Sequence, residues 1–527
     1  MKKIFKLLAV LVISPSCSED HINLINPSEL SVEGYYKTQA DIQTAIYGIY
    51  DGVKPLYDVP YLLHEIRSDV SRFDPIGMSG QRDRAFDEFY QLLSSSGGDL
   101  QTIWDQSYAV IARANIILER AESATYLDPS LLPQHKADAR FMRALVYLYL
   151  NKFFGGIAEN GSLLGVPLVD KVISQQESYN YVRAGLEDVY NLIIQDLEYA
   201  RENLPPKNGK PVTRGQATSG AAQALLGKVY MLMAGYPLNK GVEYYVKASR
   251  EFEPVIGIGA STPYALLPDY SRLWDPANKN SAESIIEIQY ASGNPGRPSP
   301  WSASCLPLLY INDKGQTGAG IMTPTESFSG TYEPGDPRKH ASMREYVIDL
   351  STPARDTLWR KHCYKYHDPR ATLALGNSNN WIELRLADVY LLYSEALVRS
   401  GGDKSAALQY LNKIRQRARQ SSQTDPALIA NPPANILPDY TLGDFPNDNA
   451  FLLAIEKERS IELAFENHRW IDLVRTGRAR EVMILEQKVD GYPDFQWSDN
   501  VLAAPIPESA MRANPGKLIQ NKGYTQL

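Results

Sequence analysis

Apolar residues recur at intervals of three and four positions along most of the chain. Ile42, Ile46 and Ile49 form one such stripe, and this is the spacing of a helix that faces a core. The same period, interrupted by Gly and Pro, predicts two blocks of helices. The first block holds helices at 100–123, 130–154, 181–204, 214–234 and 244–256, and the second at 381–399, 404–419 and 449–477.

The segment between the two blocks, residues 257–380, has a different pattern. It is dense in Gly, Pro, Ser and Asn, contains short β-like runs such as 284–290, and shows no long helical period. A second stretch rich in Pro, Asn and Asp, at 421–447, indicates an exposed loop. We therefore expect a mainly α fold with a large irregular, loop-rich region that contains short β segments.

Two helix pairs share a pattern of small and large apolar residues. The first pair has Gly227 and Tyr230 on its first helix. Ala248 and Phe252 follow on its second helix, and residues 393–414 repeat similar offsets. This pattern resembles the tetratricopeptide repeat, in which helix pairs interlock and stack, while a generic helical hairpin is the alternative. Such a scaffold offers surfaces to partners.

The start of the chain has the parts of an export signal. Several lysines precede an apolar run at 7–13, which is too short to span a bilayer because spanning takes about 20 residues. The small residues before Cys17 resemble the cleavage site of bacterial lipoproteins, whose mature chain begins at an acylated cysteine. Ser14 and Pro15 depart from the usual site, so cleavage at another position is the alternative.

Charge and cysteine content exclude several classes of protein. Lys plus Arg number 54 against 61 Asp plus Glu, a net charge of −7. No basic domain stands out, so nucleic acid is not an expected partner. After Cys17 only Cys305 and Cys363 remain, too few for a disulfide scaffold or a zinc site. We expect two buried thiols, with one disulfide as the alternative.

The sequence carries no motif of a catalytic, cofactor or metal site. It has no Gly-x-Ser-x-Gly elbow, P-loop or His-Glu-x-x-His, so we expect a protein that is not an enzyme and holds no cofactor. Glu462, Glu466 and His468 lie close together on one predicted helix, as metal ligands would. Arginines interleave with the acidic residues of that helix, however, so ion pairing is the expected use of these charges.

Several long blocks, read in order, resemble the SusD/RagB family of nutrient-binding outer-membrane lipoproteins. Residues 139–156, ARFMRALVYLYLNKFFGG, are similar to the family's ARFLRALYYFYLVKYFGG segment. Residues 385–397 and 411–415 are similar to its RLADVLLMYAEAL and LNKVR blocks, and 458–475 to its ERRIELAFEGHRWFDLVR block. The resemblance covers almost the whole mature chain. One departure is an insertion at 157–164, which lengthens a loop.

This resemblance implies a fold, a partner and a location. The fold would be a tetratricopeptide-repeat-like helical superhelix (SusD-like), packed on a SusC-like TonB-dependent outer-membrane transporter as a lid. Cys17 would carry the lipid anchor, and Glu19 and Asp20 resemble the signal for display on the cell exterior. The expected function is capture of an oligosaccharide and its delivery to the transporter. The RagB branch of the family leaves a peptide or another nutrient open as the ligand.

The family also implies that loops outside the repeat scaffold contact the ligand. Aromatic rings stack there on sugar faces, and polar groups bind the hydroxyls. Two loops qualify, at 290–301 and 68–74. For Trp301, the leading candidate, the alternative is that it fills a cluster beneath its loop. Six residues are expected to bind the ligand: Trp301, Tyr310, Arg297, Asn294, Arg72 and Phe73.

Two other tryptophans are assigned differently. Trp274 precedes a segment similar to a structural part of the family, so it is expected in the core. Trp381 stands just before the block at 385–397, where it would serve either the core or the ligand site.

These observations divide the chain into five parts. Residues 1–16 are expected to be the signal peptide and 17–34 a lipid-anchored tether. Residues 35–256 are expected to form the N-terminal helical part, 257–380 the loop-rich ligand-binding region, and 381–527 the C-terminal helical part with the closing segment. At this length a composite unit with two intimate lobes is expected, because a single core stops growing near about 250–300 residues.

Overall fold

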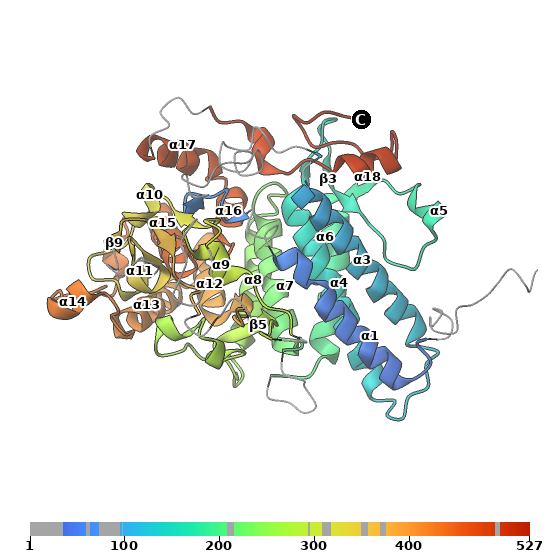
Figure 1. The fold of residues 1–527 in the computed structure, drawn as a ribbon, viewed down its shortest axis with the longest axis horizontal. Coiled ribbons are helices and arrows are strands. Elements are labelled where there is room, and N and C mark those ends of the chain that lie inside the picture. Colours follow the sequence, from blue (N-terminus) through green and yellow to red (C-terminus); the bar gives the residue numbers. More distant parts are fainter. Residues whose placement is uncertain are drawn as a thin grey trace, which may run out of the picture.

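The computed structural model describes the helical body of the chain and much of its loop-rich region. Figure 1 shows the blue-to-green helices of the first block on one side and the orange helices of the second block on the other. Among the described residues, none of the helices has the length and hydrophobicity needed to cross a bilayer. The described residues are 35–58, 64–72, 95–96, 98–207, 215–293, 296–307, 318–348, 357–368, 371, 376–490 and 496–527.

The first block is a row of helices in which each long helix packs against the next. Thr38 and Thr218 begin the first and fifth of these, because their side-chain oxygens accept backbone N–H groups of Asp41 and Ala221. The predicted helices of this block are confirmed within a few residues, apart from the starts predicted at 181 and 214, where the helices begin at 186 and 219. They are α1 (Gln39–Gly52), α3 (Gly98–Arg120), α4 (Leu131–Phe154), α6 (Leu186–Asn203), α7 (Ser219–Ala234) and α8 (Val242–Val255).

The predicted interlocking helix pairs are present. Helix α7 packs on α8, and α12 (Leu386–Ser400) packs on α13 (Lys404–Gln420) and α8. Gly227 explains the small residue of the pattern, since a Cβ added there would lie 2.4 Å from the Phe252 ring. The two helices therefore approach more closely than any larger residue would allow.

Two predicted helix starts are strands. Residues 381–385 form β11 (Trp381–Arg385), which pairs antiparallel with β5 (Ser284–Ile288). The segment Trp-Ile-Glu-Leu-Arg suits either element, and its distant partner strand decides the outcome. Residues 183–185 form β4 (Arg183–Gly185) on β3 (Leu163–Pro167). The buried Arg183 holds that strand in place by donating to the carbonyl oxygens of Gly165 and Phe154 at 2.7 and 2.9 Å.

The predicted helix at 449–477 is broken into α15 (Asp448–Glu462) and α16 (Arg469–Arg475). Between them Phe465 and Asn467 adopt left-handed backbone conformations, with φ of 64° and 65°. The carboxylate of Glu65 accepts the N–H groups of both residues, at 2.8 and 2.6 Å. A distant side chain thus satisfies backbone donors that a continuous helix would have used.

Short elements make up the described part of the loop-rich region, as its composition predicted, and further short elements lie elsewhere in the chain. Residues 343–348 and 357–363 form the two sides of one hairpin, in which β7 pairs with β10 and β8 with β9. The insertion at 157–164 joins β2 to β3 as a smaller hairpin. The strands are β1 (Ser71–Arg72), β2 (Gly156–Ile157), β6 (Thr323–Pro324), β7 (Met343–Arg344), β8 (Val347–Ile348), β9 (Thr357–Leu358) and β10 (His362–Cys363). The helices are α5 (Gln175–Ser178), α9 (Trp301–Cys305), α10 (Glu326–Ser329), α11 (Pro337–Ser342), α14 (Pro426–Ala430), α17 (Ala479–Val489) and α18 (Glu508–Ala513), with 3₁₀ turns η2 (Lys54–Tyr57), η4 (Tyr270–Arg272), η5 (Pro276–Asn278), η6 (Leu442–Asp444) and η7 (Asp499–Leu502).

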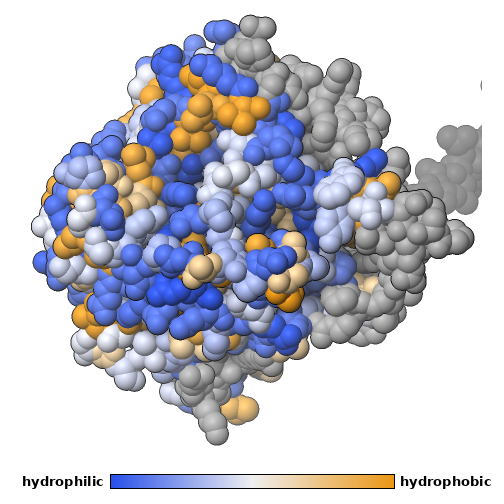
Figure 2. All heavy atoms as spheres, turned by 90° about the vertical axis from the view of Figure 1, so that its left-hand side faces the viewer, coloured by the Kyte–Doolittle hydropathy of each residue, from blue (hydrophilic) through white to orange (hydrophobic). Residues whose placement is uncertain are grey.

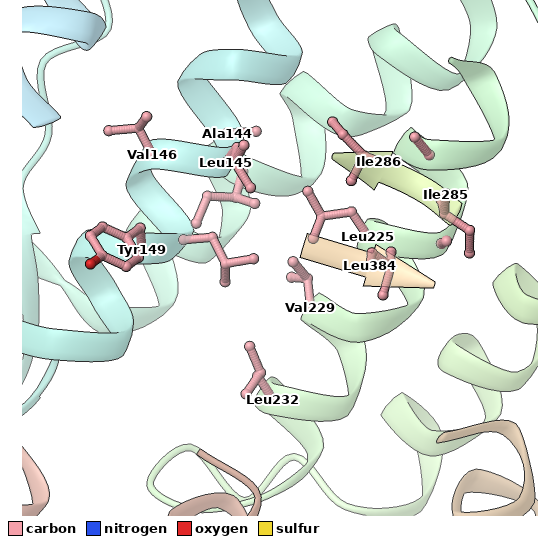
Figure 3. Close-up of a cluster of buried hydrophobic side chains, with 14 of the residues drawn as sticks. Ala144, Leu145, Val146, Tyr149, Leu225, Val229, Leu232, Ile285, Ile286 and Leu384 are labelled. Atoms are coloured by element: carbon pink, nitrogen blue, oxygen red, sulfur yellow. The ribbon is translucent and has the colours of Figure 1, made fainter. Parts of the chain in front are cut away.

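One large apolar core joins the two blocks. Figure 3 shows Leu225 and Val229 of α7 facing Leu384 of β11 and Ile286 of β5. These side chains are at most 5% exposed, so the strand pair between the blocks is packed directly against the repeat helices. The loop-rich region is therefore built on a rigid base.

Cys305 and Cys363 are both buried, and no disulfide joins them.

Candidate ligand-binding surface

The structure describes three of the six residues predicted to bind the ligand. Asn294, Phe73 and Tyr310 lie outside the described residues, as does Cys17. Trp301, Arg297 and Arg72 are described, and the structure places them in three different environments.

Trp301 is a core residue, which corrects the prediction that it contacts the ligand. Its side chain is 0% exposed. Its ring centroid lies 4.6 Å from that of Trp381, 6.2 Å from Tyr290 and 6.3 Å from Tyr366. A ring with no exposed face cannot stack on a sugar. The sequence alone does not reveal that Trp301 is a core residue, because its partner rings are distant along the chain. Trp274 and Trp381 are buried in the same way.

Arg297 anchors its loop to Asp58, the residue that follows η2. Its guanidinium lies 2.8 Å from the carboxylate of Asp58, and its side chain is 39% exposed. The Tyr290 hydroxyl also faces Asp58, at 3.4 Å, and donates to the carbonyl oxygen of Lys54 at 3.3 Å. Arg297 therefore fixes the loop while part of its side chain stays open to solvent.

Arg72 belongs to a separate chain of polar contacts. It lies in β1, opposite Thr323 of β6, and its guanidinium is 2.8 Å from the buried carboxylate of Asp490. Asp490 also accepts the backbone N–H groups of Ser327 and Glu326, at 3.1 and 3.3 Å, at the start of α10. The end of α17, β1 and α10 are thus joined at one carboxylate.

The same chain of contacts leads to an exposed tryptophan. The carboxylate of Glu326 pairs with the ammonium of Lys361, two positions after Trp359. Trp359 is 78% exposed, whereas the other six tryptophans are buried or partly buried. Its ring meets Tyr346 edge-on, with centroids 5.7 Å apart, one step along the hairpin from the Val347–Leu358 pair.

We call this group the Arg72–Trp359 strip. It consists of Arg72, Asp490, Glu326, Lys361, Trp359 and Tyr346. It offers one exposed ring beside carboxylates and cations, the set that binds sugar faces and hydroxyls. The sequence pattern did not indicate Trp359 as a site residue. Arg360 and Lys361 follow it directly, and such charged residues are mostly exposed.

The side of the molecule that carries the hairpin is mostly hydrophilic. Figure 2 shows apolar residues there in separate small groups. The described part of this face therefore lacks the broad apolar patch that a permanent protein interface presents. Among the residues that the structure describes, no three His, Cys, Asp or Glu side chains are grouped as metal ligands. Glu462 and Glu466 instead pair with arginines and a lysine.

One titratable group near the strip has a displaced pKa. Burial, with the nearby Asp490 carboxylate, raises the pKa of Glu486 to about 8. Because the folded state holds this proton more tightly than the unfolded chain does, stability falls as the pH rises from about 4.5 to about 8.

Glu486→Gln is therefore expected to remove that loss of stability. Thermal unfolding of both proteins between pH 5 and pH 9 measures it, and we expect the variant to gain about 1–2 kcal/mol relative to the unaltered protein at the alkaline end. Glu481→Gln is the control, because the Glu481 side chain is 70% exposed. Identical pH profiles for unaltered protein and Glu486→Gln would contradict the assignment.

Fold and surface together define a helical-repeat scaffold that carries surface loops and an exposed tryptophan. Two family models match the sequence of this scaffold. The model described as "SusD family" matches residues 349–524, and the model described as "Starch-binding associating with outer membrane" matches residues 28–231. SusD-like protein P2 of Formosa agariphila is 27% identical over 545 residues, which cover 98% of this chain and 98% of that protein.

Solved structures have the same fold. A SusD superfamily protein from Parabacteroides distasonis superposes with a TM-score of 0.75 at 25% identity, covering 92% of this chain and 99% of that one. Surface glycan-binding protein A from Bacteroides thetaiotaomicron, in complex with laminarihexaose, gives a TM-score of 0.70 at 22% identity, covering 92% and 100%. The two family models, the relative and the solved structures all support the SusD/RagB family for this chain.

Proposed function

We propose that this protein is a surface-exposed, lipid-anchored glycan-binding subunit that captures an oligosaccharide and delivers it to a SusC-like TonB-dependent outer-membrane transporter. Similarity to the family supports carbohydrate binding, as does the structural relative that was solved with laminarihexaose. The description of one matching family model supports the outer membrane. The anchor at Cys17, the outward orientation and the transporter are part of the proposal.

The exposed ring of Trp359 is the observation that carries the glycan site. Its indole face suits the apolar C–H side of a pyranose. Lys361, two positions after Trp359 in the chain, pairs with Glu326. This pair offers a donor and an acceptor to sugar hydroxyls, directly or through water. Arg72, whose side chain is 20% exposed, adds a further donor and is held by the buried carboxylate of Asp490. Binding without turnover follows, since the strip needs only stacking and hydrogen bonds.

Trp359→Ala is expected to weaken glycan binding about 10- to 100-fold, because burying a large apolar side chain contributes about 1.5–3 kcal/mol. Isothermal calorimetry with laminarihexaose and a broad panel of oligosaccharides and polysaccharides measures the loss. Thermal unfolding of the variant should match that of the unaltered protein, since the ring makes few contacts. Tyr179→Ala is the matched control, because Tyr179 is 40% exposed and follows α5 in the first helical block.

Two outcomes would contradict this site. Unchanged binding by Trp359→Ala would show that the strip is not the glycan site. Binding of peptides, with no binding across the glycan panel, would favour the alternative of a RagB-like lid subunit for another nutrient. Co-purification with a transporter agrees with both functions, so ligand profiling separates them.

A further inference from the structure

A pocket, distinct from the Arg72–Trp359 strip, lies between the first helix and the strand pair of the core. Its volume is about 310 Å³, at the lower end of the range of about 300–1,000 Å³ for small-molecule sites. Residues of α1 and η2 form one wall, and β5 with the following Gln289 forms the other. Gln216 closes one side.

Hydrogen bonds hold the walls of this pocket in place. The Tyr50 hydroxyl donates to Asp138 at 2.7 Å and accepts the N–H of Ala217 at 2.9 Å, which ties the segment at Gln216 to α1. The side chains of Gln289 and Asn280 exchange two hydrogen bonds of 3.0 Å. The pocket is thus preformed, and a ligand would lose little affinity to ordering the protein.

The lining combines an apolar floor with a polar rim. Met142, Ile286 and Ile288 form the floor. The Tyr47 side chain, 46% exposed, stands at the rim. Beside it the Asp51 carboxylate and the Lys54 ammonium lie 2.6 Å apart, so this pair offers an acceptor and a donor with no net charge.

From this combination we infer that the pocket binds one neutral sugar ring. A ring of that kind presents an apolar face to Tyr47 and hydroxyls to Asp51, Lys54 and Gln216. An ion is disfavoured, because Asp51 and Lys54 neutralise each other. Glu287 also lines the pocket, but its carboxylate already accepts hydrogen bonds from Ser284, Asn280 and Asn380. The size of the pocket limits the occupant to about one ring, unlike the open Arg72–Trp359 strip.

This inference rests on the proposed glycan-binding function and adds a site to it. Figure 1 shows α1 well apart from β9, the strand that leads into Trp359. The two sites are therefore separate, and a branched or long glycan that reached both would bind more tightly than to either alone.

The test uses glucose, galactose, mannose and xylose as probes of the pocket, and laminarihexaose with the glycan panel as probes of the strip. Ligand-detected NMR titrations compare the unaltered full chain with Tyr47→Ala, Asp51→Asn, Trp359→Ala and the control Tyr179→Ala. We expect at least one of the four sugars to bind, and its affinity to fall at least about fivefold in Tyr47→Ala and Asp51→Asn. Trp359→Ala and Tyr179→Ala should retain that affinity.

The possible outcomes separate this inference from the proposed function. The inferred sugar pocket is overturned when none of the four sugars shows binding that Tyr47→Ala weakens. It is also overturned when the dipeptide alanyl-alanine, and none of the sugars, shows binding that Tyr47→Ala weakens. Loss of monosaccharide binding in Trp359→Ala alone also overturns it, because that would assign the sugar to the strip. Failure of the glycan function appears instead as no Trp359-dependent binding across the glycan panel. Thermal unfolding of Tyr47→Ala confirms that the variant is folded.

Discussion

Arg385→Ala is expected to lower the free energy of unfolding by about 3–5 kcal/mol, because removing one member of a buried ion cluster leaves charges without compensation. Arg385 is 1% exposed. Its guanidinium lies 2.7–2.9 Å from carboxylate oxygens of Glu283, Glu462 and Glu466. Alanine would leave these three buried acids with fewer cations and with an empty volume between them.

The pKa of Glu462 shows how strongly the cluster depends on its arginines. Burial alone would raise the pKa of this carboxyl. The guanidinium groups of Arg417, Arg385 and Arg338 overcome that effect and hold the pKa well below its usual range. Stability from this group is therefore present above the ordinary glutamate pKa and is lost as the pH falls through the lowered value.

Denaturant unfolding of Arg385→Ala beside Arg512→Ala tests this prediction. Arg512 forms an ion pair with Glu508, but its side chain is 69% exposed. Such a surface pair contributes about 0–1 kcal/mol. Similar small losses in both variants would show that the cluster adds no more than a surface pair does. A loss in Arg385→Ala with no change in the slope of the denaturant dependence would confirm a direct effect on the folded state.

This cluster also shows which contacts the sequence pattern predicts and which it does not. The interleaved charges of 458–475 predicted ion pairing, and Arg459 does pair with Asp472, and Arg469 with Glu456. The pattern did not reveal that the partners of Glu462 come from β11 and α13, far along the chain. Periodicity identifies which residues share a face of one helix, whereas burial depends on what packs against that face.

Long-range partners explain the other errors in the same way. The helix at 381–399 lost its first residues to a strand because Ser284–Ile288 pairs with them. The helix at 449–477 is interrupted because Glu65 accepts N–H groups of the turn between its halves. Helix propensity is a weak prior that tertiary contacts override. The repeat pairs were predictable because both members of each pair are neighbours in the sequence.

The candidate site was less predictable than the fold. Loop residues have no period, so a tryptophan in a loop fits a ligand platform or a buried plug equally well. Trp301 and Trp359 both lie in the loop-rich region, yet one is 0% and the other 78% exposed. What separates them is their partners in space: three aromatic rings surround Trp301, whereas Tyr346 is the described ring that contacts Trp359.

Trp301→Ala is expected to lower the free energy of unfolding by about 3–5 kcal/mol, because truncating a buried tryptophan removes its apolar contacts and leaves a cavity. The lost ring packs against Trp381, with centroids 4.6 Å apart, and against Tyr290. The Tyr290 hydroxyl contacts Asp58, the partner of Arg297. Folded molecules of the variant should still bind glycan through the Arg72–Trp359 strip. Denaturant unfolding measures the first effect, and calorimetry on the folded protein well below its Tm measures the second.

Comparison of Trp301→Ala with Trp359→Ala makes this prediction decisive, because the two substitutions remove the same side chain from opposite environments. We expect Trp301→Ala to lose stability and keep affinity, and Trp359→Ala to lose affinity and keep stability. Trp301→Phe should lose less stability than Trp301→Ala, since phenylalanine refills part of the cavity. A Trp301→Ala protein with unchanged stability and abolished glycan binding would instead return Trp301 to the ligand site and show that the loop above it opens in solution.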